Sequence, residues 1–305
     1  MNPIKNSFSI KNLENISGIK AHTIRIWEKR YAILSPNRSQ TNIRRYSLES
    51  LKKLLNITLL YKSGYKISKI STIPSEELET IVKAITLNST AENVYVNLFK
   101  LSMISFDKTM FYKTFNKIIS EHDFEFIYIK IFIPLMNDLG ILWQTHSISI
   151  SHEHFITNLI KQQLHVKTEI LNKKSMFNKS KIKFILFLPE NEFHELSILF
   201  LNYLILSHGF KTIFLGQSTP NKDLKTILNN DESMHFISFF TVRPNKEEII
   251  NYLIDFKEQI LINKNIQLSI FGPQISLLLN IRIPDKINLF YSLDEFKNKI
   301  LLKKR

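Results

Sequence analysis

The chain has no cysteine, only six glycines and no long uninterrupted hydrophobic run among its 305 residues. The absence of cysteine excludes disulfides, thiolate metal sites and cysteine nucleophiles, and it fits a cytoplasmic protein. The longest apolar runs are broken by Lys, Asn or Ser well short of the ~20 residues that a helix needs to cross a bilayer. The first residues, MNPIKNSFSI, lack the cationic start and apolar core of a signal peptide. We therefore expect a cytoplasmic chain of two or three domains with no membrane association.

The net charge of +14 is concentrated near the N-terminus. Residues 1–75 hold 14 Lys and Arg against 3 Asp and Glu, whereas residues 76–178 hold 10 against 11 and residues 179–305 hold 17 against 13. Cationic side chains gathered in one segment release condensed counterions when they contact a polyanion. If these charges served only solubility, we would expect the excess of Lys and Arg to be distributed more evenly along the chain. The first quarter of the chain is therefore predicted to bind nucleic acid.

Two short helices joined by a tight turn are indicated by SIKNLENISGIKAHTIRIWEKRY, residues 9–31. Ser9 is a suitable N-cap, and Gly18 suits the end of the first helix because glycine tolerates a positive φ. A second helix with one apolar and one cationic face suits the DNA major groove, where arginine can bind guanine through two hydrogen bonds. The two faces carry Ile24, Trp27 and Tyr31, and His22, Arg25 and Lys29.

A basic turn, LSPNRSQTNIRRYS, follows these helices and suits a wing that lies along the phosphate backbone. Together with IKAHTIRIWEKRY before it and GYKISKI after it, this turn resembles the winged helix-turn-helix of the MerR transcriptional regulators over about 70 residues. The resemblance implies a DNA-binding domain at residues 1–75 that binds a double-stranded operator, with Trp27 and Ile24 in its core. The residues that it implies at the DNA are His22, Thr23, Arg25, Arg30, Tyr31, Arg38, Arg44, Arg45 and Tyr46.

Residues 76–178 have a helical pattern with few glycines, which predicts a helical bundle. One segment of it combines Trp143, nine further residues, and then the pair Glu153-His154. Ser151 is a fair N-cap for the last helix, whose first turn would hold Glu153 near the positive helix end. Taken alone, these residues also fit a core tryptophan, a helix-start charge and a surface histidine. The helices are expected at 76–86, 90–104, 107–121, 123–138 and 151–172.

From residue 179 to 305, apolar strands alternate with amphipathic helices. This alternation predicts a five-stranded parallel sheet of the flavodoxin-like (Rossmann-like) type, with ligands bound at the carboxyl ends of the strands. His194 follows the first strand, and Gly216, Ser238 and Gly272 lie at the ends of the next three. The strands are expected at 182–188, 211–215, 235–240, 267–271 and 287–290, and the helices at 194–207, 221–229, 245–262, 274–280 and 293–303.

The segment from Glu192 to Ser197 resembles the signature of the cobalamin-binding domain, in which an acidic residue and a histidine precede a glycine. The resemblance implies that His194 is the lower cobalt ligand, that Glu192 accepts its other ring N–H, and that the nucleotide tail enters the side of the sheet. Ser238 and Gly272 match the later Ser-x-Leu and Gly-Gly signatures. The sequence departs from the family at Ser197, Phe240 and Pro273, each of which adds bulk around the tail.

The three segments occur in the same order as in light-sensing MerR regulators that carry adenosylcobalamin, and that resemblance covers nearly the whole chain. It implies that Trp143 and Glu153 shelter the upper adenosyl group and that His154 can become the upper ligand after photolysis. It also implies a regulator, not an enzyme, that self-associates as a dimer or tetramer.

Three alternatives remain open at this point. The first is a regulator whose bundle and sheet are a degenerate, cofactor-free scaffold for protein contacts. The second is a corrinoid carrier for methyl transfer, which would leave the basic winged helix without a role. The third is a zinc hydrolase built on His152, His154 and His194, although no nucleophile or base arrangement accompanies these histidines.

Overall fold

The computed structural model describes residues 7–74, 77–78, 80–82, 92–174, 182–228 and 233–302. The chain forms two compact units, Met1–Ile160 and Lys161–Arg305. The first unit holds the winged helices and the bundle, and the second holds the parallel sheet. Their boundary falls within one long helix, α10 (Ile150–Lys174).

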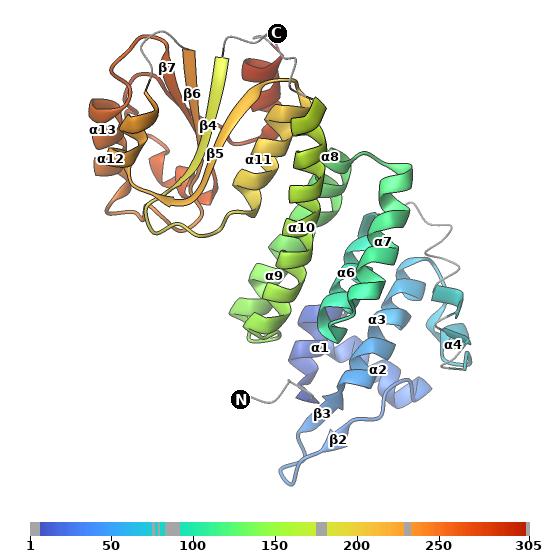
Figure 1. Ribbon diagram of the computed structural model, residues 1–305. Coiled ribbons are helices and arrows are strands. Elements are labelled where there is room, and N and C mark those ends of the chain that lie inside the picture. Colours follow the sequence, from blue (N-terminus) through green and yellow to red (C-terminus); the bar gives the residue numbers. More distant parts are fainter. Residues whose placement is uncertain are drawn as a thin grey trace. The chain divides into compact units, whose positions relative to one another are not determined.

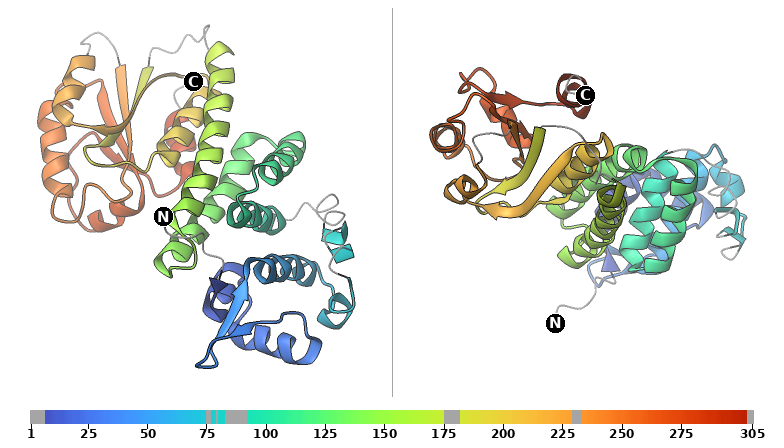
Figure 2. Two further views of the ribbon diagram at one scale, coloured as in Figure 1. Left: turned by 60° about the horizontal axis from the view of Figure 1, so that its bottom comes forward. Right: turned by 45° about the horizontal axis from the view of Figure 1, so that its top comes forward.

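The basic segment folds as a winged helix-turn-helix. As predicted, Ser9 caps the first helix by accepting a hydrogen bond from the Asn12 backbone, and Gly18 ends it at φ 73°. A three-stranded antiparallel sheet in the order β1-β3-β2 contains the wing hairpin, which projects from the helices in Figure 1 and in the left view of Figure 2. Its elements are α1 (Ile10–Ser17), α2 (Ala21–Tyr31), β1 (Ser7–Phe8), β2 (Asn37–Arg38), β3 (Arg44–Ser47), α3 (Leu48–Lys62) and α4 (Ile67–Ile70).

The helical bundle largely follows the predicted pattern, with differences at helix ends. The helix expected at 123–138 continues to Gln144 through a π-helical turn, and the last helix begins at Ile150, so Ser151 lies inside the helix and is not its cap. The helix expected at 76–86 lies largely outside the described residues. The remaining elements of the bundle are α6 (Glu92–Ser105), α7 (Lys108–Glu121), α8 (Phe124–Ile127), the π turn (Tyr128–Phe132) and α9 (Ile133–Gln144).

The continuous helical segment Phe124–Gln144 is the one helix of the described residues that is long and apolar enough to cross a membrane, judged by length and composition alone. Its inward residues, among them Phe132 and Leu135, are fully buried. Phe132 packs against Phe99 of α6 at a ring-centroid distance of 5.3 Å. The apolar character of this segment is therefore used, at least in part, to form the core of the bundle.

The second unit contains five parallel strands in the order β5-β4-β6-β7-β8. In Figure 1, α11 lies on one side of the sheet and α12 and α13 lie on the other. The expected helices after β5 and β7 are mostly short or 3₁₀ in form. The strands are β4 (Ile182–Pro189), β5 (Lys211–Thr219), β6 (Ser233–Phe239), β7 (Ile266–Phe271) and β8 (Ile287–Leu289), and the helices are α11 (Leu196–Ser207), α12 (Asn221–Leu224), α13 (Ile249–Gln259) and α14 (Leu293–Phe296), which a π turn (Lys297–Leu301) continues.

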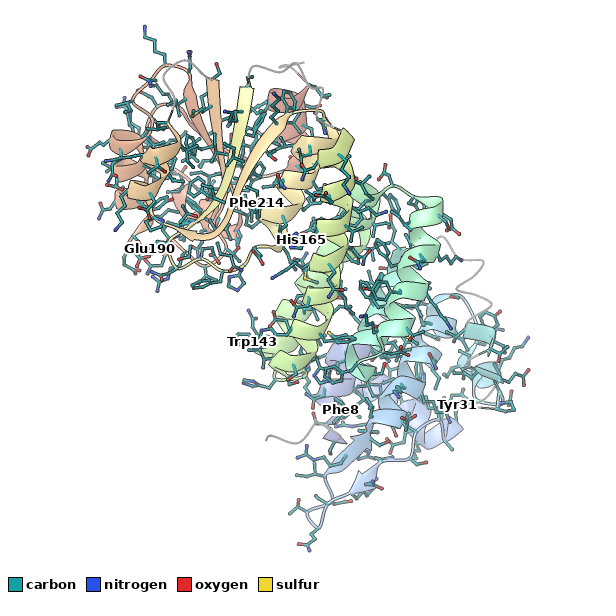
Figure 3. The ribbon with its side chains drawn as sticks, viewed as in Figure 1. Phe8, Tyr31, Trp143, His165, Glu190 and Phe214 are labelled. Carbon is teal, nitrogen blue, oxygen red and sulfur yellow. The ribbon has the colours of Figure 1, made fainter. Side chains whose placement is uncertain are left out.

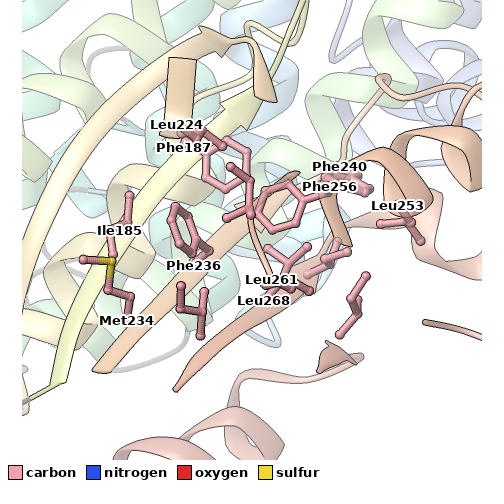
Figure 4. Packing of buried hydrophobic residues seen from close by; sticks show 14 of the residues in the cluster. Ile185, Phe187, Leu224, Met234, Phe236, Phe240, Leu253, Phe256, Leu261 and Leu268 are labelled. Carbon is pink, nitrogen blue, oxygen red and sulfur yellow. The ribbon is translucent and has the colours of Figure 1, made fainter. Parts of the chain in front are cut away.

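Both faces of this sheet are covered by hydrophobic core. Alternate residues of β4 divide between the two: Leu186 faces the α11 side, and Phe187 faces the α13 side. Figure 4 shows the α13 side, where Phe187, Phe236 and Phe256 pack together. A sheet buried on both faces explains why its strands read as nearly continuous apolar runs in the sequence.

Candidate functional site

The imidazole of His194 stands on the loop after β4, at the carboxyl edge of the sheet. Its side chain is 61% exposed, whereas that of Glu192, two residues earlier, is 1% exposed. The Nδ1 atom of His194 lies 2.6 Å from Glu192 Oε1, and the backbone N–H of His194 donates to the same oxygen at 3.0 Å. The contact with a carboxylate favours the tautomer that carries its proton on Nδ1, in which the lone pair of the ring is on Nε2.

Glu192 joins two loops of the sheet. Its Oε2 atom accepts hydrogen bonds from the backbone N–H groups of Val242, at 2.6 Å, and Arg243, at 2.8 Å, both on the loop after β6. β4 and β6 are neighbours, and the loops that follow them lead to helices on opposite faces. The pair therefore marks the switch point at which folds of this type bind ligands.

The same contacts determine the ionisation of Glu192. Burial by itself raises the pKa of this carboxyl, but the hydrogen bonds from His194 and from the backbone amides of Arg243, Val242 and His194 outweigh burial and lower the pKa to about 2. Glu192 is therefore an anion at neutral pH, which strengthens the electron donation of His194 to a metal.

The donor set fits a metal that brings most of its own ligands. Among the described residues, no group of three or more His, Asp and Glu side chains is placed to hold a metal ion. A zinc centre needs three or four protein ligands, so the zinc hydrolase alternative finds no support in the described part of the chain. A corrin already supplies four nitrogen ligands to cobalt, so a single side-chain donor from the protein would be enough. The imidazole of His194, exposed and oriented by Glu192, is a donor of this kind.

The other predicted cofactor residues of the sheet domain lie around the same edge, but not all of them face outward. Ser197 is half-buried in the first turn of α11. Ser238 is fully buried, and its hydroxyl donates to the carbonyl oxygen of Phe187 at 3.0 Å. Gly272 has φ 108°, and a Cβ atom there would lie 2.3 Å from the carbonyl oxygen of Phe240. Gly272 therefore allows its backbone to lie close to that of Phe240. The buried hydroxyl of Ser238 binds the backbone of Phe187 and does not line the surface of the site.

Phe240, where the sequence departs from the family signature, lies just after the end of β6. Its ring is fully buried in the core on the α13 side and meets Tyr252 at a ring-centroid distance of 5.5 Å. The side chain of Phe240 therefore belongs to the hydrophobic core on the α13 side of the sheet.

The predicted cap residues gather at one end of the bundle. Trp143, labelled in Figure 3, lies near the end of α9 and is 55% exposed. Glu153 is half-buried, and His154 is exposed, in the first turns of α10. By contrast, His152 is buried, its ring stacks on Phe106 at 4.6 Å, and its Nδ1 atom lies 2.7 Å from Ser149 Oγ. The exposed tryptophan and histidine leave this end of the bundle able to contact a flat apolar ligand.

The predicted DNA-contacting residues mostly share the exposed surface of α2 and the wing. Glu28 ties the wing to the recognition helix by accepting hydrogen bonds from Arg44 Nε at 3.1 Å and from the Tyr46 hydroxyl at 2.8 Å. Tyr46 is only 1% exposed, so the predicted direct contact of Tyr46 with DNA is corrected to a supporting role. The exposed residues are His22, Arg25, Arg30, Arg38 and Arg45, and the partly exposed ones are Thr23, Tyr31 and Arg44.

Two functional contacts had no sign in the sequence. The amides of Val242 and Arg243 reach Glu192 across 50 residues, and a backbone donor carries no sequence signature. In the bundle, the buried hydroxyl of Ser147 accepts hydrogen bonds from the side-chain amides of Asn12 at 3.2 Å and Asn15 at 3.1 Å. This second contact joins α1 of the winged domain to the loop between Trp143 and Glu153.

Comparison with known families identifies both functional parts. Residues 8–77 match the model of the MerR HTH family regulatory protein, and residues 96–166, which include Trp143, Glu153 and His154, match that of the B12 binding domain. The chain combines a MerR-type DNA-binding domain with a B12-binding domain. Cobalamin is thus its cofactor class and DNA its macromolecular partner.

Curated relatives extend this similarity over most of the chain. The HTH-type transcriptional repressor CarH of Myxococcus xanthus is 20% identical over 224 residues, which cover 72% of this chain and 73% of the relative. The HTH-type transcriptional repressor CarA of the same organism is 23% identical over 214 residues, which cover 69% and 68%, respectively. The chain is homologous to these repressors, and its role is transcription regulation.

A solved structure supports the fold of the bundle and sheet. The monomethylamine corrinoid protein of Methanosarcina barkeri is 13% identical, with a TM-score of 0.53, and the match covers 73% of this chain and 96% of that one. The likeness confirms the predicted fold of helices and five-stranded parallel sheet.

Proposed function

We propose that this chain is a light-responsive transcriptional repressor that uses adenosylcobalamin as its sensor. The observation that carries the proposal is His194, an exposed imidazole oriented by a buried carboxylate, in a chain that also carries a MerR-type domain. Its homology to the CarH and CarA repressors favours repression over activation.

Each part of the proposed sensor has a defined task. His194 would hold the cobalt of a bound corrinoid, and Glu192 orients its ring and keeps the proton on Nδ1. Trp143 and Glu153 would shelter the adenosyl group of a bound cofactor, and exposed His154 would supply a second imidazole for cobalt. The bound cofactor supplies a cobalt–carbon bond that light can break.

The response requires that the two ligand states stabilise different contacts of the protein, because a ligand that binds both states equally shifts nothing. The loop between Trp143 and Glu153 is suited to this task, since it carries Ser147, which contacts α1 of the DNA-binding domain. We propose that loss of the upper ligand changes the self-association of the chain, from a dimer or tetramer in the dark, and thereby its operator affinity. A palindromic operator would require at least a dimer.

The proposal is tested by absorbance titration of the purified chain with adenosylcobalamin in the dark. Wild-type protein is expected to bind one equivalent and to change its visible spectrum after green light. His194→Ala is expected to lose most of this binding, whereas His208→Ala, at the other end of α11, is a matched control that retains it. Wild-type protein that stays colourless in excess cofactor would overturn the proposal.

The cofactor-free regulator is the second candidate. The observation that favours it is the complete burial of Ser238, which leaves this serine unable to contact the nucleotide tail of a cobalamin at the protein surface. A colourless protein that still binds DNA with sequence preference would establish this candidate.

A further inference from the structure

We infer that the second unit holds a further binding site, for a short aliphatic amine, in a cavity on the α13 side of the sheet. The volume of this cavity is about 460 Å³, within the range of roughly 300–1,000 Å³ that is usual for small-molecule sites. The loops after β4 and β6, the start of α12 and one face of α13 line it. Neither Glu192 nor His194 lines the cavity, so the inference goes beyond the proposed function and is independent of it.

Two polar side chains of the cavity wall carry a buried atom that has no hydrogen-bond partner among the described residues. These atoms are Asn221 Oδ1 and the hydroxyl oxygen of Tyr252. Asn221 as a whole is only 8% exposed. Buried polar atoms of folded proteins are almost always hydrogen-bonded, so the two atoms indicate partners from outside the chain. Because both atoms are enclosed, only a small head group can approach them.

The orientation of Asn221 determines which kind of partner its oxygen needs. Asn221 Nδ2 donates a hydrogen bond to Asp255 Oδ2 at 2.8 Å. A carboxylate can only accept, so the amide nitrogen must be the atom that faces Asp255. The remaining atom, Oδ1, carries no proton and therefore needs a donor. The hydroxyl of Tyr252 can also accept a hydrogen bond from a donor.

Asp255 gives this part of the cavity a negative charge. Its other oxygen, Oδ1, accepts a hydrogen bond from the side-chain amide of Gln259, so both of its side-chain partners are neutral. Within the described part of the chain, no Lys, Arg or His forms an ion pair with Asp255. Burial and, second to it, the charge of Asp255 raise the pKa of Tyr252, so its hydroxyl stays neutral at physiological pH.

The other charged side chains of the cavity wall also favour a cation as the ligand. Arg243 Nη1 lies 2.6 Å from Glu248 Oε1, so the charges of these two residues offset each other. The remaining charged residues of the wall are Glu190, Asp255 and Lys222. Two carboxylates against one ammonium leave a net charge of −1 on the wall.

A primary ammonium group matches these features. It carries one positive charge and three N–H donors that can reach separate acceptors. Asn221 Oδ1, the Asp255 carboxylate and the Tyr252 hydroxyl are three such acceptors. Three proline rings on the wall provide apolar surface for an aliphatic chain: Pro189, Pro220 and Pro244.

The test is isothermal titration calorimetry of the full chain with putrescine, a short chain with an ammonium at each end. We expect saturable binding of putrescine and no binding of butanediol, which has the same carbon chain but no charge. The net charge of +14 opposes nonspecific binding of a cation, so saturation reports a site.

Two carboxylates of α13 provide a matched pair of variants. Asp255→Asn keeps the shape of the side chain but removes its charge, and it should weaken putrescine binding about 10- to 100-fold. Glu258→Gln alters an exposed carboxylate that does not line the cavity, and it should leave the dissociation constant unchanged.

Tyr252→Phe covers the case in which Asp255→Asn fails to fold. It removes a buried hydroxyl that has no partner in the described part of the chain, so the melting temperature should not fall. Its affinity for putrescine should nevertheless fall about tenfold, because one hydrogen bond to the ammonium is lost.

The inference is wrong if putrescine does not bind saturably, if butanediol binds equally well, or if Asp255→Asn and Glu258→Gln give equal dissociation constants. Saturable binding of inorganic phosphate in place of putrescine would assign the cavity to anions through Lys222, and would overturn the inference as well. None of these results bears on adenosylcobalamin, whose binding is tested separately with His194→Ala.

Discussion

The carboxylate of Glu192 is buried, and it accepts five hydrogen bonds from groups on two loops. The pairing of Glu192 with His194 was predicted from the resemblance of this segment to the cobalamin-binding signature. The hydrogen bonds from the backbone of Val242 and Arg243 to Glu192 could not be predicted, because they depend on the pairing of β6 beside β4. The residue that orients the imidazole is therefore also the residue that joins the two sides of the switch point.

Replacing Glu192 with Gln should weaken cobalamin binding about 10- to 100-fold, the usual effect of removing a carboxylate that orients a metal-bound histidine. The neutral amide can still accept some of the hydrogen bonds, but it cannot support the Nδ1 proton with a negative charge. Absorbance titration measures the effect. Glu190→Gln, an exposed carboxylate on the same loop and labelled in Figure 3, is the control. Equal loss in both variants would contradict the role of Glu192.

Glu192 also makes the stability of the fold depend on acid. Its pKa in the folded chain is about 2, below the ordinary value of 4.5. A carboxyl whose pKa is lowered by folding stabilises the fold fully above its ordinary pKa, and this stabilisation is lost as the pH falls from about 4.5 toward 2. Denaturation midpoints of wild-type protein should therefore fall over this range more steeply than those of Glu192→Gln. If the midpoints of wild-type protein and Glu192→Gln fell equally with pH, this result would contradict the lowered pKa of Glu192.

At the scale of elements, the winged domain and the bundle are joined by polar contacts that composition does not reveal. Ser147→Ala should lower the free energy of unfolding by about 1–3 kcal/mol, because it leaves the amides of Asn12 and Asn15 without their acceptor in a partly buried joint. Urea denaturation measures this loss. Ser151→Ala, at an exposed position in the first turn of α10, should change the free energy of unfolding by no more than about 0.5 kcal/mol. Equal free energies of unfolding for Ser147→Ala and Ser151→Ala would contradict a stabilising contact at Ser147.

The recognition helix and the wing should respond differently to the loss of a charge. Arg25→Ala should cost about 1–3 kcal/mol at one operator base pair and relax sequence preference there. Arg45→Ala, on the wing, should weaken all sequences alike and reduce the salt slope of binding by about 1. Binding isotherms on matched duplexes at several salt concentrations separate the two. Loss of preference in Arg45→Ala alone would reverse the assignment.

Elements with a strong signal in the local sequence could be predicted, whereas features that depend on contacts between residues distant in the sequence could not. The caps at Ser9 and Gly18 and the buried strands of the sheet were read correctly from residue type and pattern. The extension of α9 to Gln144 and the start of α10 at Ile150 depend on packing within the bundle. Tyr46 was expected at the DNA from the family resemblance, but its hydroxyl donates a hydrogen bond to Glu28 of α2.

At the scale of the whole molecule, the cationic segment and the proposed cofactor site lie in different parts of the chain. The cationic surplus belongs to the winged domain, and His194 to the sheet domain of the second unit. Coupling between them needs an element whose contacts differ between the two states. The loop that carries Ser147 is our candidate for that element, because it lies between the cap residues and contacts α1.

The most direct test of the account measures DNA affinity of one sample in the dark and after green light, with adenosylcobalamin bound. The duplex is first selected from a random pool by dark-state protein. The account predicts tight binding in the dark, at least tenfold weaker binding after illumination, and no light effect in His194→Ala. Equal affinity in dark and light, in protein whose spectrum shows bound and photolysed cofactor, would contradict it.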